Sequence, residues 1–188
     1  ALFRNARRQA GSWEALRAEF GVRLPVLTYH NVGPRRHPEH GELTVPAEKF
    51  ERQIRWLARN GYTGIRAADW LAWRRQGKPL PPKPVLVTFD DGYADLVEYP
   101  FPVLLRYGFP ATVFLVTRQL GGWNKWDQAP LMTAEQVRAW AARGMEFGAH
   151  SRTHPDLRTL SGASLAEEIA GSAGDLTRIL GTEVVPFA

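Results

Sequence analysis

The 188-residue sequence contains no cysteine, which excludes disulfide bonds, thiolate metal sites and cysteine nucleophiles. Long apolar runs are also missing: residues 111–116 form one of the longest, far below the ~18 residues of a membrane-spanning helix. Residues 1–10 lack the apolar core of a signal peptide. Hydrophobic residues make up 44% of the chain and charged residues 23%, so we expect a folded globular protein without an integral membrane segment.

Acidic residues are outnumbered, with 19 Asp and Glu against 24 Lys and Arg, and the net charge is +5. A basic balance can indicate a nucleic-acid partner. The arginines cluster at residues 4–8, 35–36 and 74–75, without the interleaved aromatics of a base-stacking surface. We therefore expect no nucleic-acid partner, and attraction to an anionic polymer of the cell envelope fits the charge equally well.

Short apolar runs alternate with helical patterns along the chain. Strands are expected at residues 24–29, 62–65, 85–89, 111–116, 145–149 and 183–187. Helices are expected at residues 50–60, 101–107, 133–143 and 165–180, each followed by a glycine. Thr133, with Gln136 three residues later, is typical of a helix N-cap. The alternation predicts an α/β fold with a parallel sheet covered by helices.

The last expected strand has no helix after it, so the sheet is either open or part of a barrel that is cut short. We prefer the second interpretation, because a domain rarely ends on a strand that should be buried.

Three expected strands end in polar residues that can bind metals or transfer protons. In a parallel sheet or barrel the carboxyl ends of the strands lie on one face. Side chains from about 120 residues of sequence should therefore converge there. They are His30, Asp90, Asp91, His150 and His154.

Asp90 and Asp91 allow two interpretations. Asp91 precedes Gly92, and Asp-Gly is common in turns, so the pair could simply form a turn. Two successive carboxylates, however, repel each other unless a cation or a proton lies between them. Their side chains point in different directions, so one can bind a metal while the other acts as a base.

His150 and His154 are four residues apart, and Gly148 and Pro155 favour a loop or a single turn around them. Alone, such a pair could be two exposed histidines. Together with Asp91 it forms a set of two histidines and one carboxylate, which suits zinc or another divalent transition metal and leaves positions open for water.

His30 could be a half-buried histidine bonded to a backbone carbonyl. At a strand end opposite the metal, it would be a natural general acid. His37 and His40 are expected to be solvated.

Tryptophans allow two interpretations as well. Trp123 and Trp126 follow a Gly-Gly pair and could form the wall of a sugar-binding groove or pack at the rim of the sheet; packing is preferred. Four others occur at helical spacing and are expected in the core: Trp56, Trp70, Trp73 and Trp140.

The sequences TFDDG at residues 88–92 and HSRTH at residues 150–154 resemble the signature of polysaccharide deacetylases, the NodB-homology domain of carbohydrate esterase family 4. The sequence LTYHNV at residues 27–32 is similar to the branch that includes poly-β-1,6-N-acetylglucosamine deacetylases. The segments at residues 93–95, 108–114 and 155–157 also look like this family. The resemblance extends from about residue 24 to residue 188.

The resemblance implies a distorted (β/α)7 barrel that removes N-acetyl groups from a glycan with a divalent metal. By position, Asp91, His150 and His154 would hold the metal, with zinc first and nickel, cobalt or iron as alternatives. Asp90 would be the general base and His30 the general acid. An acetylated glycan would be the substrate, and the protein would be secreted or associated with the cell envelope.

The domain organisation expected from this resemblance is an N-terminal helical extension at residues 1–23 and a NodB-homology domain at residues 24–188. We expect that domain to be incomplete at its carboxyl end, because residues 185–188 look like the approach to a Pro-Tyr-Gly-like segment. The alternatives are an O-acetyl esterase of the xylan type and a non-catalytic glycan-binding module with a relic metal site.

Overall fold

The computed structural model describes residues 24–34 and 43–188. Within these residues, the main sheet has five strands: β1 (Val26–Tyr29), β4 (Thr63–Ile65), β5 (Pro84–Phe89), β6 (Thr112–Leu115) and β7 (Glu146–Ala149). All of its pairings are parallel. The predicted extension at residues 1–23, together with His37 and His40, lies outside the described residues.

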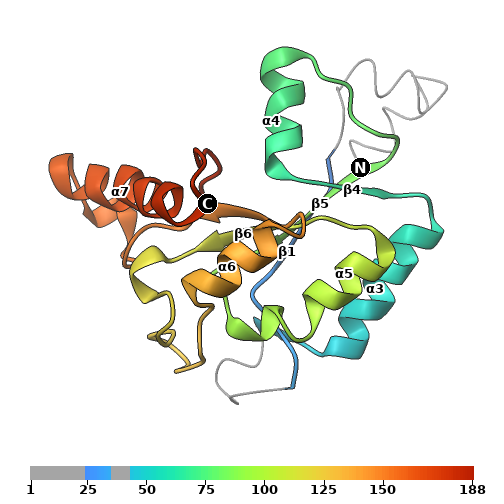
Figure 1. Ribbon diagram of the computed structural model, residues 1–188, viewed down its shortest axis with the longest axis horizontal. Helices are drawn as coiled ribbons and strands as arrows, with labels where there is room; N and C mark the ends of the chain where they lie inside the picture. The colour runs from blue at the N-terminus through green and yellow to red at the C-terminus, as the bar shows by residue number, and fades with distance from the viewer. Residues whose placement is uncertain (1–23, 35–42) are drawn as a thin grey trace, which may run out of the picture.

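Strand β5 is the centre of the sheet (Figure 1), and all six of its residues are buried. Leu86 pairs with both Val26 of β1 and Ile65 of β4, so β1 and β4 lie on opposite sides of β5. Thr88 pairs with both β1 and β6, which places β6 on the same side as β4, farther along β5. Strand β7 follows beside β6. A small second sheet joins β2 (Asn31–Val32) to β3 (Thr44–Val45).

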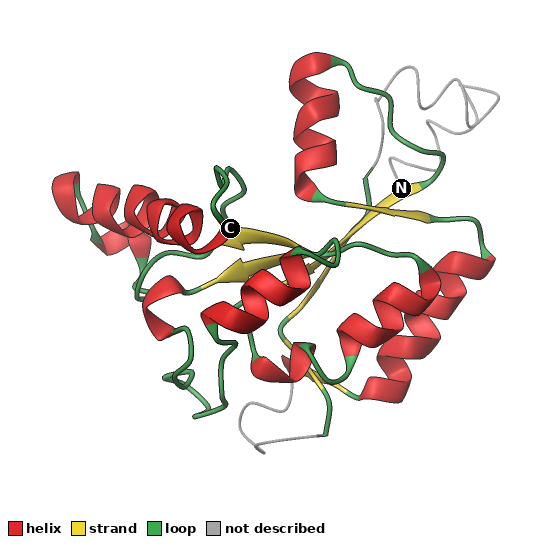
Figure 2. Ribbon diagram, in the orientation of Figure 1, coloured by secondary structure: helices red, strands yellow, loops and turns green. Residues whose placement is uncertain are grey.

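Helices are arranged around the sheet (Figure 2). They are α3 (Ala47–Arg59), α4 (Ala67–Gln76), α5 (Pro100–Tyr107), α6 (Ala134–Ala141) and α7 (Gly162–Leu180). Helix α3 packs against α5, and both α6 and α7 pack against β7. Short 3₁₀ turns occur at η2 (Ala94–Leu96), η3 (Thr117–Gln119) and η4 (Leu157–Thr159). None of the helices in the described part of the chain is long and apolar enough to cross a lipid bilayer.

Aromatic side chains form much of the core between the sheet and its helices. The ring centroid of Phe89 in β5 lies 5.8 Å from that of Phe50 in α3 and 6.2 Å from that of Phe101 in α5. Phe101 also contacts Trp140 in α6, at 4.8 Å. All four side chains are buried, and each buried phenylalanine contributes about 1.5–3 kcal/mol. This cluster fixes the direction of β5 and of the residues that follow it.

The core prediction is correct for Trp140 but wrong for Trp56, which is 57% exposed. Helix α3 buries Phe50, Ile54 and Leu57, and Trp56 projects from a different face of that helix. Trp70 and Trp73 of α4 are only half-buried; their rings stack on each other with centroids 4.6 Å apart.

The predicted fold class, an α/β fold with a parallel sheet and covering helices, is confirmed. The predicted N-cap at Thr133 is also confirmed, because Thr133 and Gln136 exchange hydrogen bonds at the start of α6. The strand expected at residues 183–187 does not form; only Phe187 makes a bridge, to Ala149 of β7. Over residues 24–34 and 43–188 the sheet is open rather than closed into a barrel.

Candidate metal centre and active site

The carboxyl ends of three strands bring the predicted site residues to one edge of the sheet. His30 follows β1, Asp90 and Asp91 follow β5, and His150 follows β7. Backbone hydrogen bonds extend the strand pairing by one residue at this edge: the Asp90 N–H donates to the Tyr29 carbonyl at 2.9 Å, and the His150 N–H donates to the Leu115 carbonyl at 3.0 Å. The backbone at the site is therefore fixed by the sheet itself.

Asp91 occupies a tight turn directly after β5. Its φ is 67°, that of Gly92 is 80°, and the Gly92 N–H donates to the Asp90 carbonyl at 2.9 Å. A Cβ at residue 92 would lie 2.3 Å from the Leu115 side chain, so only glycine fits. The turn interpretation of this pair is thus correct, but the turn also orients the carboxylate of Asp91, which is 7% exposed, toward two imidazoles.

Three ligand atoms meet at this turn. Nε2 of His150 lies 3.7 Å and Nε2 of His154 lies 3.6 Å from Oδ1 of Asp91, and the two nitrogens are 3.2 Å apart. Ligands bound tetrahedrally to zinc at about 2.0–2.2 Å lie roughly 3.3–3.5 Å from one another. The three atoms are therefore spaced as the ligands of one zinc-sized ion would be.

The surroundings of the two histidines also suit metal binding. Nδ1 of His150 lies 2.7 Å from the Ala188 carbonyl oxygen, which can only accept, so Nδ1 is the donor in this hydrogen bond and Nε2 is the nitrogen that faces Asp91. Burial lowers the pKa of His154, against the opposing effect of Asp91. A neutral imidazole is the form that binds a metal. As predicted, residues 150–154 form a loop rather than a helix.

Asp90 and His30 lie beside the metal-ligand cluster. Nε2 of His30 is 4.0 Å from Oδ2 of Asp90, and both side chains are half-buried. Burial raises the pKa of Asp90, while His150 and His30 oppose the rise. A carboxylate with a raised pKa next to a histidine is suited to proton transfer near neutral pH.

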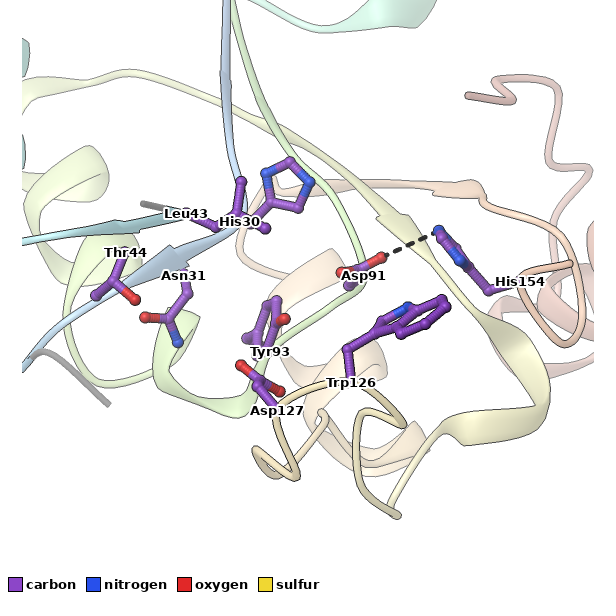
Figure 3. A pocket seen from close by; sticks show the side chains of 9 residues that line it. All are labelled: His30, Asn31, Leu43, Thr44, Asp91, Tyr93, Trp126, Asp127 and His154. Carbon is purple, nitrogen blue, oxygen red and sulfur yellow. Dashed lines mark ion pairs between the residues drawn. The ribbon is translucent and has the colours of Figure 1, made fainter. Parts of the chain in front are cut away.

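A pocket of about 280 Å³ opens at the same edge of the sheet (Figure 3). In this view His30 and His154 lie on either side of Asp91, and the indole of Trp126 lies close to both Asp91 and His154. The lining residues are His30, Asn31, Leu43, Thr44, Asp91, Tyr93, Trp126, Asp127 and His154.

The preferred packing interpretation is wrong for Trp123 and Trp126, which are 63% and 61% exposed. The segment that carries them folds back on itself. Trp123 forms an isolated β-bridge with Pro130, and the Asn124 N–H donates a hydrogen bond to the Ala129 carbonyl at 2.8 Å. This arrangement buries Asn124 and Ala129 and leaves both indoles in solvent. Trp126 thereby becomes part of the pocket wall.

Five of the lining residues were not predicted as site residues. Asn31 directly follows His30 and Tyr93 follows the Asp-Asp-Gly turn, so adjacency to a strand end could have indicated them. Thr44 begins β3 and Leu43 precedes it, and nothing in the sequence indicates that these two residues reach the pocket. Asp127 directly follows Trp126, so the groove interpretation of the tryptophans could have indicated it.

Comparison with known proteins points to one family. A family model described as Polysaccharide deacetylase matches residues 77–188, a range that includes Asp90, Asp91 and both metal-site histidines. YxkH of Bacillus subtilis (strain 168), which is named for the same family, is 31% identical over 157 residues, or 84% of this chain and 52% of YxkH. The poly-beta-1,6-N-acetyl-D-glucosamine N-deacetylase of Escherichia coli (strain K12) is 34% identical over 98 residues, or 52% of this chain and 14% of that protein.

A solved structure supports the same relationship. The Streptococcus pyogenes deacetylase PplD in complex with acetate superimposes with a TM-score of 0.77 and 25% identity, covering 88% of this chain and 73% of PplD. The chain spans about half the length of YxkH and a smaller part of the Escherichia coli enzyme.

Proposed function

This chain belongs to the polysaccharide deacetylase family, and from that premise we propose that it hydrolyses N-acetyl groups of an amino-sugar polysaccharide with the help of a bound divalent metal ion. The observation that carries the proposal is the position of Asp90 and His30 directly beside the cluster of Asp91, His150 and His154. An acid, a base and a set of metal ligands at one edge of the sheet are the components that amide hydrolysis requires.

Asp91, His150 and His154 would hold the ion, because their three ligand atoms are spaced for it and all face one point. Zinc is the first expectation for a site with two imidazoles and one carboxylate, and nickel, cobalt or iron suit the same ligands. When bound, such a cation polarises a carbonyl oxygen and lowers the pKa of water.

Asp90 is proposed as the general base. Its carboxylate accepts a proton from the water molecule whose oxygen forms the new bond to the acetyl carbon. Burial raises the pKa of Asp90, which makes its carboxylate a better proton acceptor. Because Asp91 is turned toward the imidazoles, the two successive carboxylates have separate tasks.

His30 is proposed as the general acid. An amine anion is a poor leaving group, so the nitrogen must receive a proton as its bond to the acetyl carbon breaks. His30 lies 4.0 Å from Asp90, close enough for both groups to reach one scissile amide. The products are acetate and the free amine of the sugar, and His30 and Asp90 then exchange protons with solvent to restore their starting states.

The pocket supports a sugar polymer as the substrate class. Trp126 presents an exposed indole at the pocket wall, and the apolar faces of sugar rings stack on such rings. The name of the Escherichia coli relative favours an N-acetylglucosamine polymer. Such a substrate supports the expectation that the protein is secreted or associated with the cell envelope.

Acetate release from partially acetylated glucosamine oligomers tests the proposal, with O-acetylated xylan measured in parallel. We expect faster release from the N-acetylated substrate, loss of activity with a chelator and recovery with zinc. Faster release from xylan would favour an O-acetyl esterase instead. Activity that resists complete metal removal would contradict the metal mechanism.

A further inference from the structure

The loop that carries both proposed histidine ligands has an unfavourable backbone. Ser151 and His154 have φ angles of 59° and 57°, in the left-handed region that costs non-glycine residues about 1–2 kcal/mol each. Within the loop, the His154 N–H donates to the Ser151 hydroxyl at 3.0 Å. Contacts from outside the loop must supply the remaining stabilisation if His154 is to stay turned toward His150 and Asp91.

Glu168 of helix α7 supplies three such contacts. Its Oε2 accepts hydrogen bonds from the N–H groups of Arg152 at 2.7 Å and Thr153 at 2.9 Å, and its Oε1 accepts from the Thr153 hydroxyl at 2.8 Å. Burial alone would raise the pKa of Glu168, but these hydrogen bonds lower it on balance. The carboxylate is therefore ionised when it binds the two peptide groups that lie between His150 and His154.

Asp175, two helical turns after Glu168, holds the same loop through the side chain of Arg152. Nε and Nη2 of Arg152 each donate to the Asp175 carboxylate at 2.8 Å. The Thr117 hydroxyl donates to the same carboxylate at 3.0 Å. Arg152 crosses α7 at Gly171, where a Cβ would lie 2.8 Å from Nε of Arg152. Residues 168, 171 and 175 therefore lie on one face of α7, and this face contacts the loop.

We propose that Glu168 is a positioning residue for the metal centre: it holds residues 152–153 so that His150 and His154 present their Nε2 atoms to one ion. The inference rests on the proposed metal site and assigns a task to a residue of α7 that contacts neither the substrate nor the metal. Groups of this kind, which orient a ligand without binding the ion, typically change metal affinity about 10- to 100-fold when they are removed.

Glu167 provides a matched control on the same helix. It has the same side chain, but it is 63% exposed and pairs only with Nη1 of Arg152 among the described contacts. Replacing Glu167 removes one negative charge from the same region and leaves the backbone of the loop untouched. A purely electrostatic effect on the metal would therefore appear in both variants, whereas a positioning effect would appear only at Glu168.

The test is the affinity of the chain for Zn²⁺, measured by competition with a chromophoric chelator for the wild type, Glu168→Ala, Glu168→Gln and Glu167→Ala. We expect Glu168→Ala to bind Zn²⁺ about 10- to 100-fold more weakly, and Glu167→Ala to remain within about twofold of the wild type. Glu168→Gln keeps one acceptor oxygen and should weaken binding about fivefold, the effect of one lost hydrogen bond. At saturating Zn²⁺, the kcat and KM of the Glu168 variants should return to those of the wild type.

Wild-type affinity in Glu168→Ala, or equal losses in the Glu168→Ala and Glu167→Ala variants, would overturn the positioning role and leave the proposed function standing. If Glu168→Ala does not fold, Glu168→Gln decides: an affinity within about twofold of the wild type overturns the inference. Failure of the wild type itself to bind Zn²⁺ would instead contradict the proposed function.

Discussion

The two ends of the parallel sheet both carry carboxylates, but the protein uses them differently. At the amino end, Glu146 of β7 accepts hydrogen bonds from the N–H groups of Ala67 at 2.8 Å and Ala68 at 3.0 Å, and from the Thr112 hydroxyl at 2.5 Å. At the carboxyl end, Asp91 accepts one hydrogen bond from within residues 24–34 and 43–188, from Asn124 at 3.3 Å, and otherwise faces two imidazoles.

The difference shows how to distinguish a structural carboxylate from a functional one. Glu146 joins the start of α4, just after β4, to β6 and β7 at the place where β4 and β6 share one side of β5. Its acceptor capacity is used by neighbouring backbone and hydroxyl groups. Asp91 retains acceptor capacity and faces atoms that can also bind a cation, so the groups around a carboxylate indicate its task better than its burial does.

Asp90→Asn should have the largest effect at the carboxyl end. Loss of a general base lowers kcat about 10²- to 10⁴-fold, while the Zn²⁺ affinity should stay unchanged because Asp90 is not among the three ligands. Acetate release and chelator competition measure the two quantities. Asp69→Asn, near the start of α4, removes the same charge far from the site and should leave kcat unchanged. Full activity in Asp90→Asn would show that the base has been assigned wrongly.

Glu146→Ala should have the largest effect at the amino end. It leaves the Ala68 N–H and the buried Thr112 hydroxyl without their acceptor, and the Ala67 N–H keeps only its 3.0 Å bond to the Thr112 hydroxyl. These losses should lower the free energy of unfolding by about 2–3 kcal/mol. Urea denaturation measures this change. The Zn²⁺ affinity of the folded variant should match that of the wild type. A variant with normal stability and weakened Zn²⁺ binding would contradict the assignment of a structural role to the amino end and of metal binding to the carboxyl end.

Trp126→Ala should raise KM about fivefold, corresponding to the ~1 kcal/mol of one aromatic contact, with little change in kcat. Trp123→Ala is the matched control, because Trp123 is equally exposed but does not line the pocket. Steady-state kinetics on glucosamine oligomers measures both variants. Equal effects at the two positions would exclude a specific sugar contact at Trp126.

Acidification should have a smaller effect on the free energy of unfolding. It acts through the carboxylate of Asp175, which binds Arg152. The hydrogen bond from Arg152 lowers the pKa of Asp175 below its ordinary value of 3.8. The stability that results is fully present above the unfolded pKa and is lost as the pH falls through the lower, folded pKa. In urea denaturation from pH 6 to 2.5, the difference in stability between the wild type and Asp175→Asn should shrink below pH 4. A difference independent of pH would exclude this linkage.

The sequence predicts the candidate site well because the carboxyl ends of parallel strands must meet. This rule alone brings His30, Asp90, Asp91 and His150 together, and the short loop adds His154. The rest depends on tertiary contacts without a local signal. Glu168 and Asp175 have the sequence pattern of a solvated helix face, and their task appears only once the loop packs on α7. The exposure of Trp126 likewise depends on how residues 121–131 fold back.

X-ray absorption at the zinc edge of the zinc-loaded chain tests the central claim most directly. We expect one zinc per chain, with two imidazole nitrogens and one carboxylate oxygen at about 2.0–2.2 Å, and loss of one imidazole in His150→Ala. A spectrum without imidazole, or one that His150→Ala leaves unchanged, would show that the ion is not held where Asp91, His150 and His154 meet.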